Sequence, residues 1–334
     1  MTLIIRSLKP KGIRNWCLAT AGLLFCGLAG FAQSQSSPPA PTSTSVPSGI
    51  SVETELVVLP VSVTDAKGDV VLGLGQQDFR VYDDGRLQKV TMFQQRDTPV
   101  TVGLIVDHSR SMGAELPEVA AAVSSFAQSS NPSDEMFVVD FNDDVSVELM
   151  DGKPFSNDPK ELAKAVSAVR ARGRTALYDA VAEGVLHLQL GHSDRKALII
   201  VSDGGDNASQ QKFSQVLALA QRSHVLIYCI GLIGETGETD PGVLRRFSKA
   251  TGGIAYFPDK TNTVTKISTQ IARDLREQYT LGFTPEKSNA GTGFRKIEVK
   301  VTASGHGKIH VRTRSGYFAG EEKPSSAQLA KGAK

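Results

Sequence analysis

Three oxygen-bearing side chains alternate in the segment Asp107-His-Ser-Arg-Ser111, directly after the apolar run Val102–Val106. On an extended loop, alternate positions turn to one side, so Asp107, Ser109 and Ser111 would present one carboxylate and two hydroxyl groups together. Hard divalent cations such as Mg²⁺ bind oxygen donors of this kind. The same residue types also cap helices and form turns, so the segment alone indicates a metal loop and a structural turn about equally.

Two further segments place similar groups beside other elements. Thr175 lies at a loop-to-helix junction in Gly173-Arg-Thr-Ala176, and Asp203 follows an apolar run in Val201-Ser-Asp-Gly-Gly205. Ligand crevices in open α/β sheets form at the carboxyl ends of the parallel strands. We therefore expect three loops on one sheet edge to bring two carboxylates and three hydroxyl groups together.

The elements that would position these loops are apolar strands alternating with amphipathic helices. Continuous apolar strands are typical of a doubly wound, mainly parallel sheet with helices on both faces. The segment 145–149 alternates between apolar and polar residues, as an edge strand does. The predicted strands are 101–106, 136–141, 145–149, 197–202, 224–230 and 254–257, and the predicted helices are 114–128, 159–169, 176–190, 213–223, 241–251 and 263–278.

Both flanks of this α/β region have the texture of β-hairpins, with short apolar runs separated by Asp- and Gly-containing turns. Because the termini of a domain often lie close together, we expect the flanks 51–98 and 279–318 to form one small β-sandwich beside an α/β domain at 99–278. The predicted flank strands are 55–64, 79–82, 88–93, 279–284, 294–302 and 308–314.

The N-terminal segment predicts export. Residues 1–32 contain four Lys or Arg residues, no acidic residue and an apolar run that ends in small residues, which is typical of a cleaved signal peptide. An uncleaved membrane anchor is the alternative, and it would be the only membrane attachment. Residues 33–50 are uncharged and rich in Ser and Pro, which predicts a disordered linker, and the polar residues 319–334 predict a disordered tail.

Charge and cysteine content limit the classes of function that fit the chain. The 334 residues include 37 Lys and Arg against 35 Asp and Glu, and loss of the four cations in 1–32 leaves 33 against 35, a formal charge of −2. This balance and the lack of a basic block disfavour nucleic-acid binding. Cys229 lies alone in an apolar run and is expected to be a buried thiol. We expect the mature chain in the periplasm, at the cell surface or secreted.

The five positions Asp107, Ser109, Ser111, Thr175 and Asp203 resemble, in this order, the metal-ion-dependent adhesion site of von Willebrand factor A domains. The flanks are similar to a bacterial subfamily of such proteins that is abundant in acidobacteria. The segments that carry this second resemblance are Gly73-Leu-Gly-Gln-Gln-Asp-Phe-Arg-Val-Tyr-Asp-Asp-Gly85, Tyr279-Thr-Leu-Gly-Phe-Thr-Pro285 and Arg314-Ser-Gly-Tyr317.

The resemblance implies a divalent cation, Mg²⁺ or alternatively Mn²⁺ or Ca²⁺, held by these five residues. Ser109, Ser111 and Thr175 would bind it directly or through water, and Asp107 and Asp203 partly through water and hydrogen bonds. One coordination position would remain for a partner. The expected partner is a protein that presents an Asp or Glu side chain.

Neighbouring polar residues have simpler expected roles. His108 and Arg110 are expected to be solvated loop residues, although Arg110 could attract an acidic partner. Asp206 and Asn207 are expected to cap the following helix. A turn before the edge strand is expected to account for the cluster of Asp140, Asn142, Asp143 and Asp144.

The sequence favours a binding protein over an enzyme. Motifs for a nucleophilic serine, a phosphate loop or a dinucleotide are absent, and the six histidines show no His-Glu-x-x-His spacing. A magnesium-dependent phosphoesterase is the enzymatic alternative. A cell-envelope scaffold with an incidental metal is the other alternative, in which the β flanks would make the important contacts.

Overall fold

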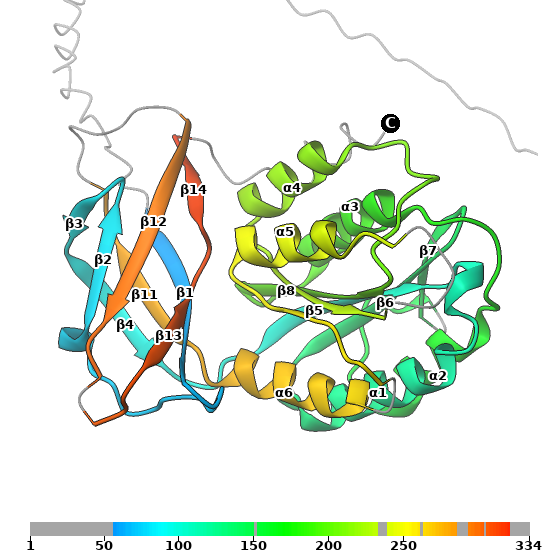
Figure 1. The fold of residues 1–334 in the computed structure, drawn as a ribbon, viewed down its shortest axis with the longest axis horizontal. Coiled ribbons are helices and arrows are strands. Elements are labelled where there is room, and N and C mark those ends of the chain that lie inside the picture. Colours follow the sequence, from blue (N-terminus) through cyan, green and yellow to red (C-terminus); the bar gives the residue numbers. More distant parts are fainter. Residues whose placement is uncertain are drawn as a thin grey trace, which may run out of the picture. The chain divides into compact units, whose positions relative to one another are not determined.

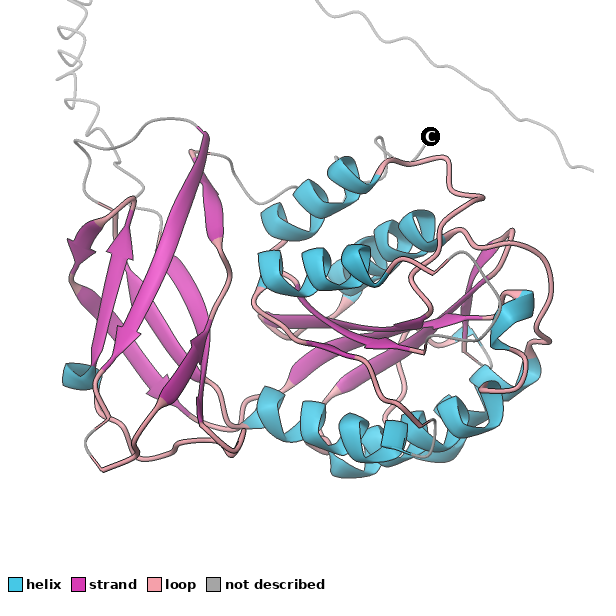
Figure 2. Cartoon of the chain, in the orientation of Figure 1, coloured by secondary structure: helices cyan, strands magenta, loops and turns pink. Residues whose placement is uncertain are grey.

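The computed structural model describes residues 56–149, 152–232, 239–260, 263–285, 293–303 and 305–320. Within these ranges the chain forms a region of strands covered by helices and a second region made of strands (Figures 1 and 2). The predicted signal 1–32, the linker 33–50 and residues 321–334 of the predicted tail lie outside the described residues.

A six-stranded sheet forms the centre of the α/β region, in the order β10-β9-β8-β5-β6-β7. Five strands run parallel, and the edge strand β7 pairs antiparallel with β6. The strands are β5 (Val100–Asp107), β6 (Glu135–Phe141), β7 (Val145–Glu148), β8 (Arg195–Ser202), β9 (Leu226–Gly231) and β10 (Ala255–Tyr256).

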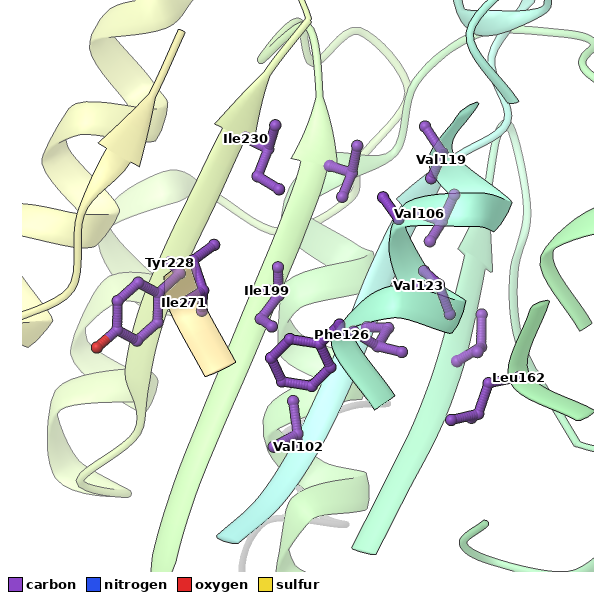
Figure 3. Close-up of a cluster of buried hydrophobic side chains, with 14 of the residues drawn as sticks. Val102, Val106, Val119, Val123, Phe126, Leu162, Ile199, Tyr228, Ile230 and Ile271 are labelled. Atoms are coloured by element: carbon purple, nitrogen blue, oxygen red, sulfur yellow. The ribbon is translucent and has the colours of Figure 1, made fainter. Parts of the chain in front are cut away.

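Helices cover both faces of this sheet, as Figure 2 shows. One face carries α1 (Leu116–Ser129), α2 (Pro159–Ala168) and α6 (Val264–Arg276), and the other carries α3 (Leu177–His187), α4 (Phe213–Arg222) and α5 (Pro241–Thr251). Figure 3 shows Phe126 of α1 and Ile271 of α6 in one cluster of buried side chains with Ile199 and Tyr228 of the sheet. The central strands β5, β6, β8 and β9 are mostly apolar, as expected for strands with both faces buried. The predicted doubly wound fold class is confirmed.

The strand order places the point where the winding direction changes between β5 and β8. The chain runs from β5 outward to β6, then crosses back to β8 on the other side of β5. The carboxyl ends of these two parallel strands therefore face the crevice that forms where the winding direction changes. Asp107 ends β5 and Ser202 ends β8 at this position.

Strands from both flanks build two four-stranded sheets, with the orders β13-β1-β11-β4 and β14-β12-β2-β3. The first flank supplies β1 (Val57–Asp65), β2 (Phe79–Asp83), β3 (Arg86–Gln88) and β4 (Val90–Gln95). The second supplies β11 (Tyr279–Phe283), β12 (Gly293–Val301), β13 (Ile309–Arg312) and β14 (Gly316–Ala319). Their inner faces share one apolar core. The predicted sandwich-like module from both flanks is therefore confirmed.

Most boundaries differ from the sequence prediction by one to three residues, and the predicted strand 88–93 is divided between β3 and β4; three of the differences have a clear local cause or consequence. The helix expected over 176–190 ends at His187 and continues as a 3-10 turn, Leu188–Leu190. The helix expected from residue 114 begins at Leu116, with Pro117 in its first turn. Ala319, placed in the tail, ends β14, because it pairs with Gly293 and its side chain is buried.

Two further observations concern the thiol and the membrane. Cys229 is fully buried in β9, as expected, and burial raises the pKa of its thiol. Within the described ranges, none of the helices has the length and apolar character needed to cross a bilayer.

Candidate metal site

The carboxylate of Asp107 is fully buried and is fixed by two hydrogen bonds. The backbone N–H of Ser109 donates to its Oδ1 at 2.8 Å, and the Ser202 hydroxyl donates to its Oδ2 at 2.6 Å. The Ser202 oxygen in turn accepts the Gly204 N–H at 3.0 Å. These bonds join the end of β5 to the end of β8 through the carboxylate itself.

A second chain of contacts links Ser109, Ser111 and Asp203. The short 3-10 turn Arg110–Met112 (η2) brings the two serine hydroxyl oxygens to 3.1 Å from each other. The Ser111 hydroxyl donates to Oδ2 of Asp203 at 2.9 Å, and the Gly205 N–H donates to the other oxygen, Oδ1, at 3.0 Å. The structure thus brings four of the five predicted residues together through two connected strand ends.

Thr175 is held at the same edge through its backbone. Its N–H donates to Oδ1 of Asn207 at 3.0 Å, and its carbonyl accepts the N–H groups of Asn207 and Ala208. The loop before it bonds to the β5 loop, because the Arg172 N–H donates to the His108 carbonyl at 2.8 Å. Backbone hydrogen bonds therefore connect the loop of Thr175 with the loops of Ser109 and Asp203.

A glycine is required beside Thr175. Gly173 has a φ of +72°, a conformation that L residues with a side chain rarely adopt, and a Cβ there would lie 1.7 Å from Oδ2 of Asp143. Asp143 accepts the Arg174 N–H at 3.1 Å and the Arg174 side chain at 2.9 Å. The turn at Gly173 thus fixes the path of the chain into Thr175.

The electrostatics of the site favour a cation. Burial raises the pKa of the Asp107 carboxyl to about 6; the hydrogen bonds from Ser109 and Ser202 oppose this, and the charge of Asp203 adds to it. A positive ion between two buried carboxylates would offset both the burial and the repulsion.

The donor set fits a hard divalent cation. Neighbouring oxygens around an octahedral Mg²⁺ with bonds of about 2.1 Å lie about 3 Å apart. The Ser109–Ser111 and Ser111–Asp203 oxygen separations, 3.1 and 2.9 Å, match this spacing. Groups of three or more His, Cys, Asp or Glu residues suited to a metal do not occur among the described residues, so the site depends on hydroxyl oxygens.

The expected solvation of His108 is wrong. Its ring is fully buried, with Nδ1 3.1 Å from Oδ1 of Asp140 and Nε2 2.9 Å from the Val166 carbonyl of α2. An apolar strand and helix α2 enclose this position, so the ring turns inward while its neighbour Arg110 remains exposed. His108 therefore supports the loop from inside the domain, between β6 and α2.

Two other assignments change. Asp140 lies buried in β6 beside His108 and is not part of a turn, whereas the Asp144 N–H donates to Oδ1 of Asn142 in the expected turn. Asp206 and Asn207 do not cap the following helix. Asp206 accepts the Tyr178 N–H at the start of α3, and Asn207 holds Thr175, because their loop packs on the preceding helix.

Sequence reasoning missed Ser202. It immediately precedes Asp203 in the Val-Ser-Asp-Gly-Gly segment, and its place at the strand end was the available signal. Strand alternation turns successive side chains to opposite faces, so Ser202 and Asp203 make different contacts: the Ser202 hydroxyl donates to Asp107, whereas Asp203 accepts the Ser111 hydroxyl.

Comparison with known proteins agrees with this fold. The family model described as von Willebrand factor type A domain matches residues 102–270, and the chain belongs to this family. The predicted family is thereby confirmed. No curated protein sequence matches the chain.

Solved structures with a similar fold include a von Willebrand factor type A protein from Catenulispora acidiphila. It has 12% identity and a TM-score of 0.48, with 84% of this chain and 79% of that chain covered. The conserved hypothetical protein BatB from Bacteroides thetaiotaomicron has 18% identity and a TM-score of 0.43, with 52% and 98% covered. Proximal thread matrix protein 1 of the mussel byssus, with a zinc-occupied MIDAS motif, has 15% identity and a TM-score of 0.46, with 58% and 49% covered.

Proposed function

We propose that this chain is an exported binding protein that holds a divalent cation and uses it to bind an acidic side chain of a protein partner. The observation that carries the proposal is the oxygen set at the β5–β8 edge, where the hydroxyls of Ser109 and Ser111 lie between two carboxylates. Two carboxylates leave a doubly charged ion without surplus negative charge around it. A partner carboxylate is the group that would complete its shell.

Each residue has a definite role in this proposal. The hydroxyls of Ser109, Ser111 and Thr175 would contact the ion directly or through water. Asp107 and Asp203 would hold these hydroxyls and offset the charge of the ion. The ion would supply a positive centre that attracts a carboxylate, with Mg²⁺ as the first choice and Mn²⁺ or Ca²⁺ as alternatives.

The arrangement disfavours hydrolysis. A metal-assisted phosphoesterase needs a group that takes a proton from water near the ion. His108 is the nearest histidine in the sequence, and its two ring nitrogens face Asp140 and the Val166 carbonyl inside the domain. Binding is therefore the better-supported function for this oxygen set.

Export is part of the proposal. The basic, acid-free start of the chain and the apolar run that follows support it. The periplasm, the cell surface and the surrounding medium are the compartments in which the partner would be met.

The direct test uses defined peptides and the full chain. NMR would follow the backbone amides of residues 107–111 during titration with Gly-Gly-Asp-Gly-Gly and with its Asn analogue, in Mg²⁺ and then in EDTA. We expect saturable shifts for the Asp peptide in Mg²⁺ alone. Asp107→Ala and Ser109→Ala should each abolish them while thermal unfolding shows that both variants remain folded.

One set of results would contradict the proposal. Shifts that persist in EDTA and in Ser109→Ala would show that the peptide binds elsewhere. The scaffold alternative would then gain support, because it makes the metal incidental.

A further inference from the structure

Three exposed arginines stand on the two loops that carry the hydroxyl groups of the metal site. Arg110 lies between Ser109 and Ser111, and Arg170 and Arg172 lie in the loop that leads to Thr175. We name Arg110, Arg170 and Arg172 the arginine rim.

Backbone contacts hold the two halves of the rim together. The Arg110 N–H donates to the Gly173 carbonyl at 3.4 Å, and the Arg172 N–H donates to the His108 carbonyl at 2.8 Å. The methyl group of Ala171 packs toward Gly113, where an added Cβ would lie 3.4 Å from it. The rim therefore borders the segment that supplies Asp107, Ser109 and Ser111, although Arg170 and Arg172 are some 60 residues away in sequence.

The side chains of the rim point to solvent. Exposure alternates along the loop: Arg170, Arg172 and Arg174 are exposed, whereas Ala171 and Gly173 between them are partly buried. Arg174 is already paired with Asp143 at 2.9 Å and supports the Thr175 loop, so it is not counted in the rim.

The rim guanidinium groups are not paired with acidic side chains of the described residues. In the described part of the chain, the side chains of Arg110, Arg170 and Arg172 form no hydrogen bond or ion pair. The predicted mature chain carries 33 basic against 35 acidic residues, so this concentration of positive charge is local and does not follow from a basic protein. Positive charges held on adjoining loops repel one another, and an anionic partner offsets the unfavourable energy of this repulsion.

We propose that the arginine rim binds acidic side chains that flank the carboxylate held by the metal, so that the partner presents a run of acidic residues. This inference rests on the proposed function, because the central carboxylate is the one that completes the ion's shell. Arginine suits the flanking positions because its planar guanidinium matches a carboxylate with two parallel hydrogen bonds. The rim thereby selects among acidic partners, whereas the metal is required for any of them to bind.

The test compares two labelled peptides on the full chain in Mg²⁺ by fluorescence anisotropy. One is Gly-Gly-Asp-Gly-Gly, and the other is Gly-Glu-Asp-Glu-Gly. We expect the second to bind about tenfold more tightly, because exposed ion pairs each contribute only a few-fold. This preference should shrink as NaCl rises from 50 to 500 mM.

The decisive variant replaces the rim, R110Q/R170Q/R172Q, and we expect the preference to fall below twofold. The matched control, K89Q/K249Q/R273Q, removes the same charge from exposed positions in the β-sandwich and in the last turns of α5 and α6. The last turns of α5 and α6 lie at the end of the sheet opposite the proposed metal site. The control variant should therefore keep the tenfold preference.

Three results would overturn the inference. Equal binding of both peptides to the wild type would do so, as would a preference that survives in the rim variant. Tighter binding of a 12-nucleotide single-stranded DNA than of either peptide, through the rim, would show that the rim serves a different class of partner. Failure of the proposed function looks different, because neither peptide would then respond to EDTA or to Asp107→Ala.

Discussion

Ser202 would organise the proposed metal site through a hydrogen bond to Asp107, without being one of the proposed ligands. It donates to Asp107 and accepts the N–H of Gly204, so it connects the ends of two strands that would each carry a ligand. Groups that orient metal ligands affect affinity strongly, because a ligand that is free to rotate must be ordered when the ion binds.

Ser202→Ala should therefore weaken Mg²⁺ binding by roughly tenfold to a hundredfold. Isothermal titration with Mg²⁺ measures this. Ser167→Ala, which removes an exposed hydroxyl on α2, is the control and should leave the affinity unchanged. An affinity equal to wild type in Ser202→Ala would show that Asp107 is positioned by other contacts.

His108 has a structural role under the loop. Its ring lies between Asp140 and the Val166 carbonyl, and both residues of the His108–Asp140 pair are buried. Removal of the ring leaves the Asp140 carboxylate buried without this partner, which is costly in a low-dielectric interior.

We expect His108→Ala to lower the free energy of unfolding by about 3 kcal/mol, as measured by urea denaturation. Arg110→Ala, two positions along and exposed, should change it by less than about 0.5 kcal/mol. Similar effects for the two substitutions would contradict the buried role of His108.

At the scale of elements, the strands and helices of the α/β region could be predicted well from the sequence. Fully apolar runs such as 102–106 and 226–230 lie in parallel strands because both of their faces are covered. The segment 241–251 starts after Asp240 and ends before Gly252 at φ +96°, which are strong local start and stop signals.

The connections between loops could not be predicted. Asn207 holds Thr175 across 32 residues, and His108 reaches Val166 across 58. Such pairs depend on how strand β8 and helices α2 and α3 are placed in space, and local pattern gives no information about that placement. The five proposed ligand positions could be selected from the sequence because each follows or precedes a recognisable element, whereas the residues that support them could not.

Asn207→Ala tests whether Asn207 positions the loop of Thr175 for metal binding. Loss of its Oδ1 leaves the Thr175 N–H without that acceptor, and we expect Mg²⁺ affinity to fall about tenfold. Asn157→Ala removes an exposed side-chain bond to the Pro132 carbonyl and should have no effect on the affinity. Unchanged Mg²⁺ binding in Asn207→Ala would mean that Thr175 is dispensable or is held otherwise.

At the scale of the whole molecule, the two flanks depend on each other. β1 lies between β11 and β13 of the second flank in one sheet, and β2 pairs with β12 of the second flank in the other. The hairpin texture predicted strands in both flanks, but which strands of the two flanks pair could not be predicted from it, because a period of two specifies a buried face and not a neighbour.

A chain that ends at Glu277 should therefore lose the order of the first flank as well. Hydrogen exchange would show the amides of β1 and β2 exchanging at nearly unprotected rates, while those of β5 and β8 remain slow. Continued protection of β1 and β2 would show that the first flank folds alone.

In the proposed site, Asp107, Ser109, Ser111, Thr175 and Asp203 hold one divalent cation. Titration of the full chain with Mn²⁺, followed by the electron paramagnetic resonance signal of the free ion, measures this directly. We expect one Mn²⁺ bound per chain, displaced by excess Mg²⁺, and none bound to a folded Ser109→Ala/Asp203→Ala variant. Equal Mn²⁺ binding by the wild type and this variant would contradict it.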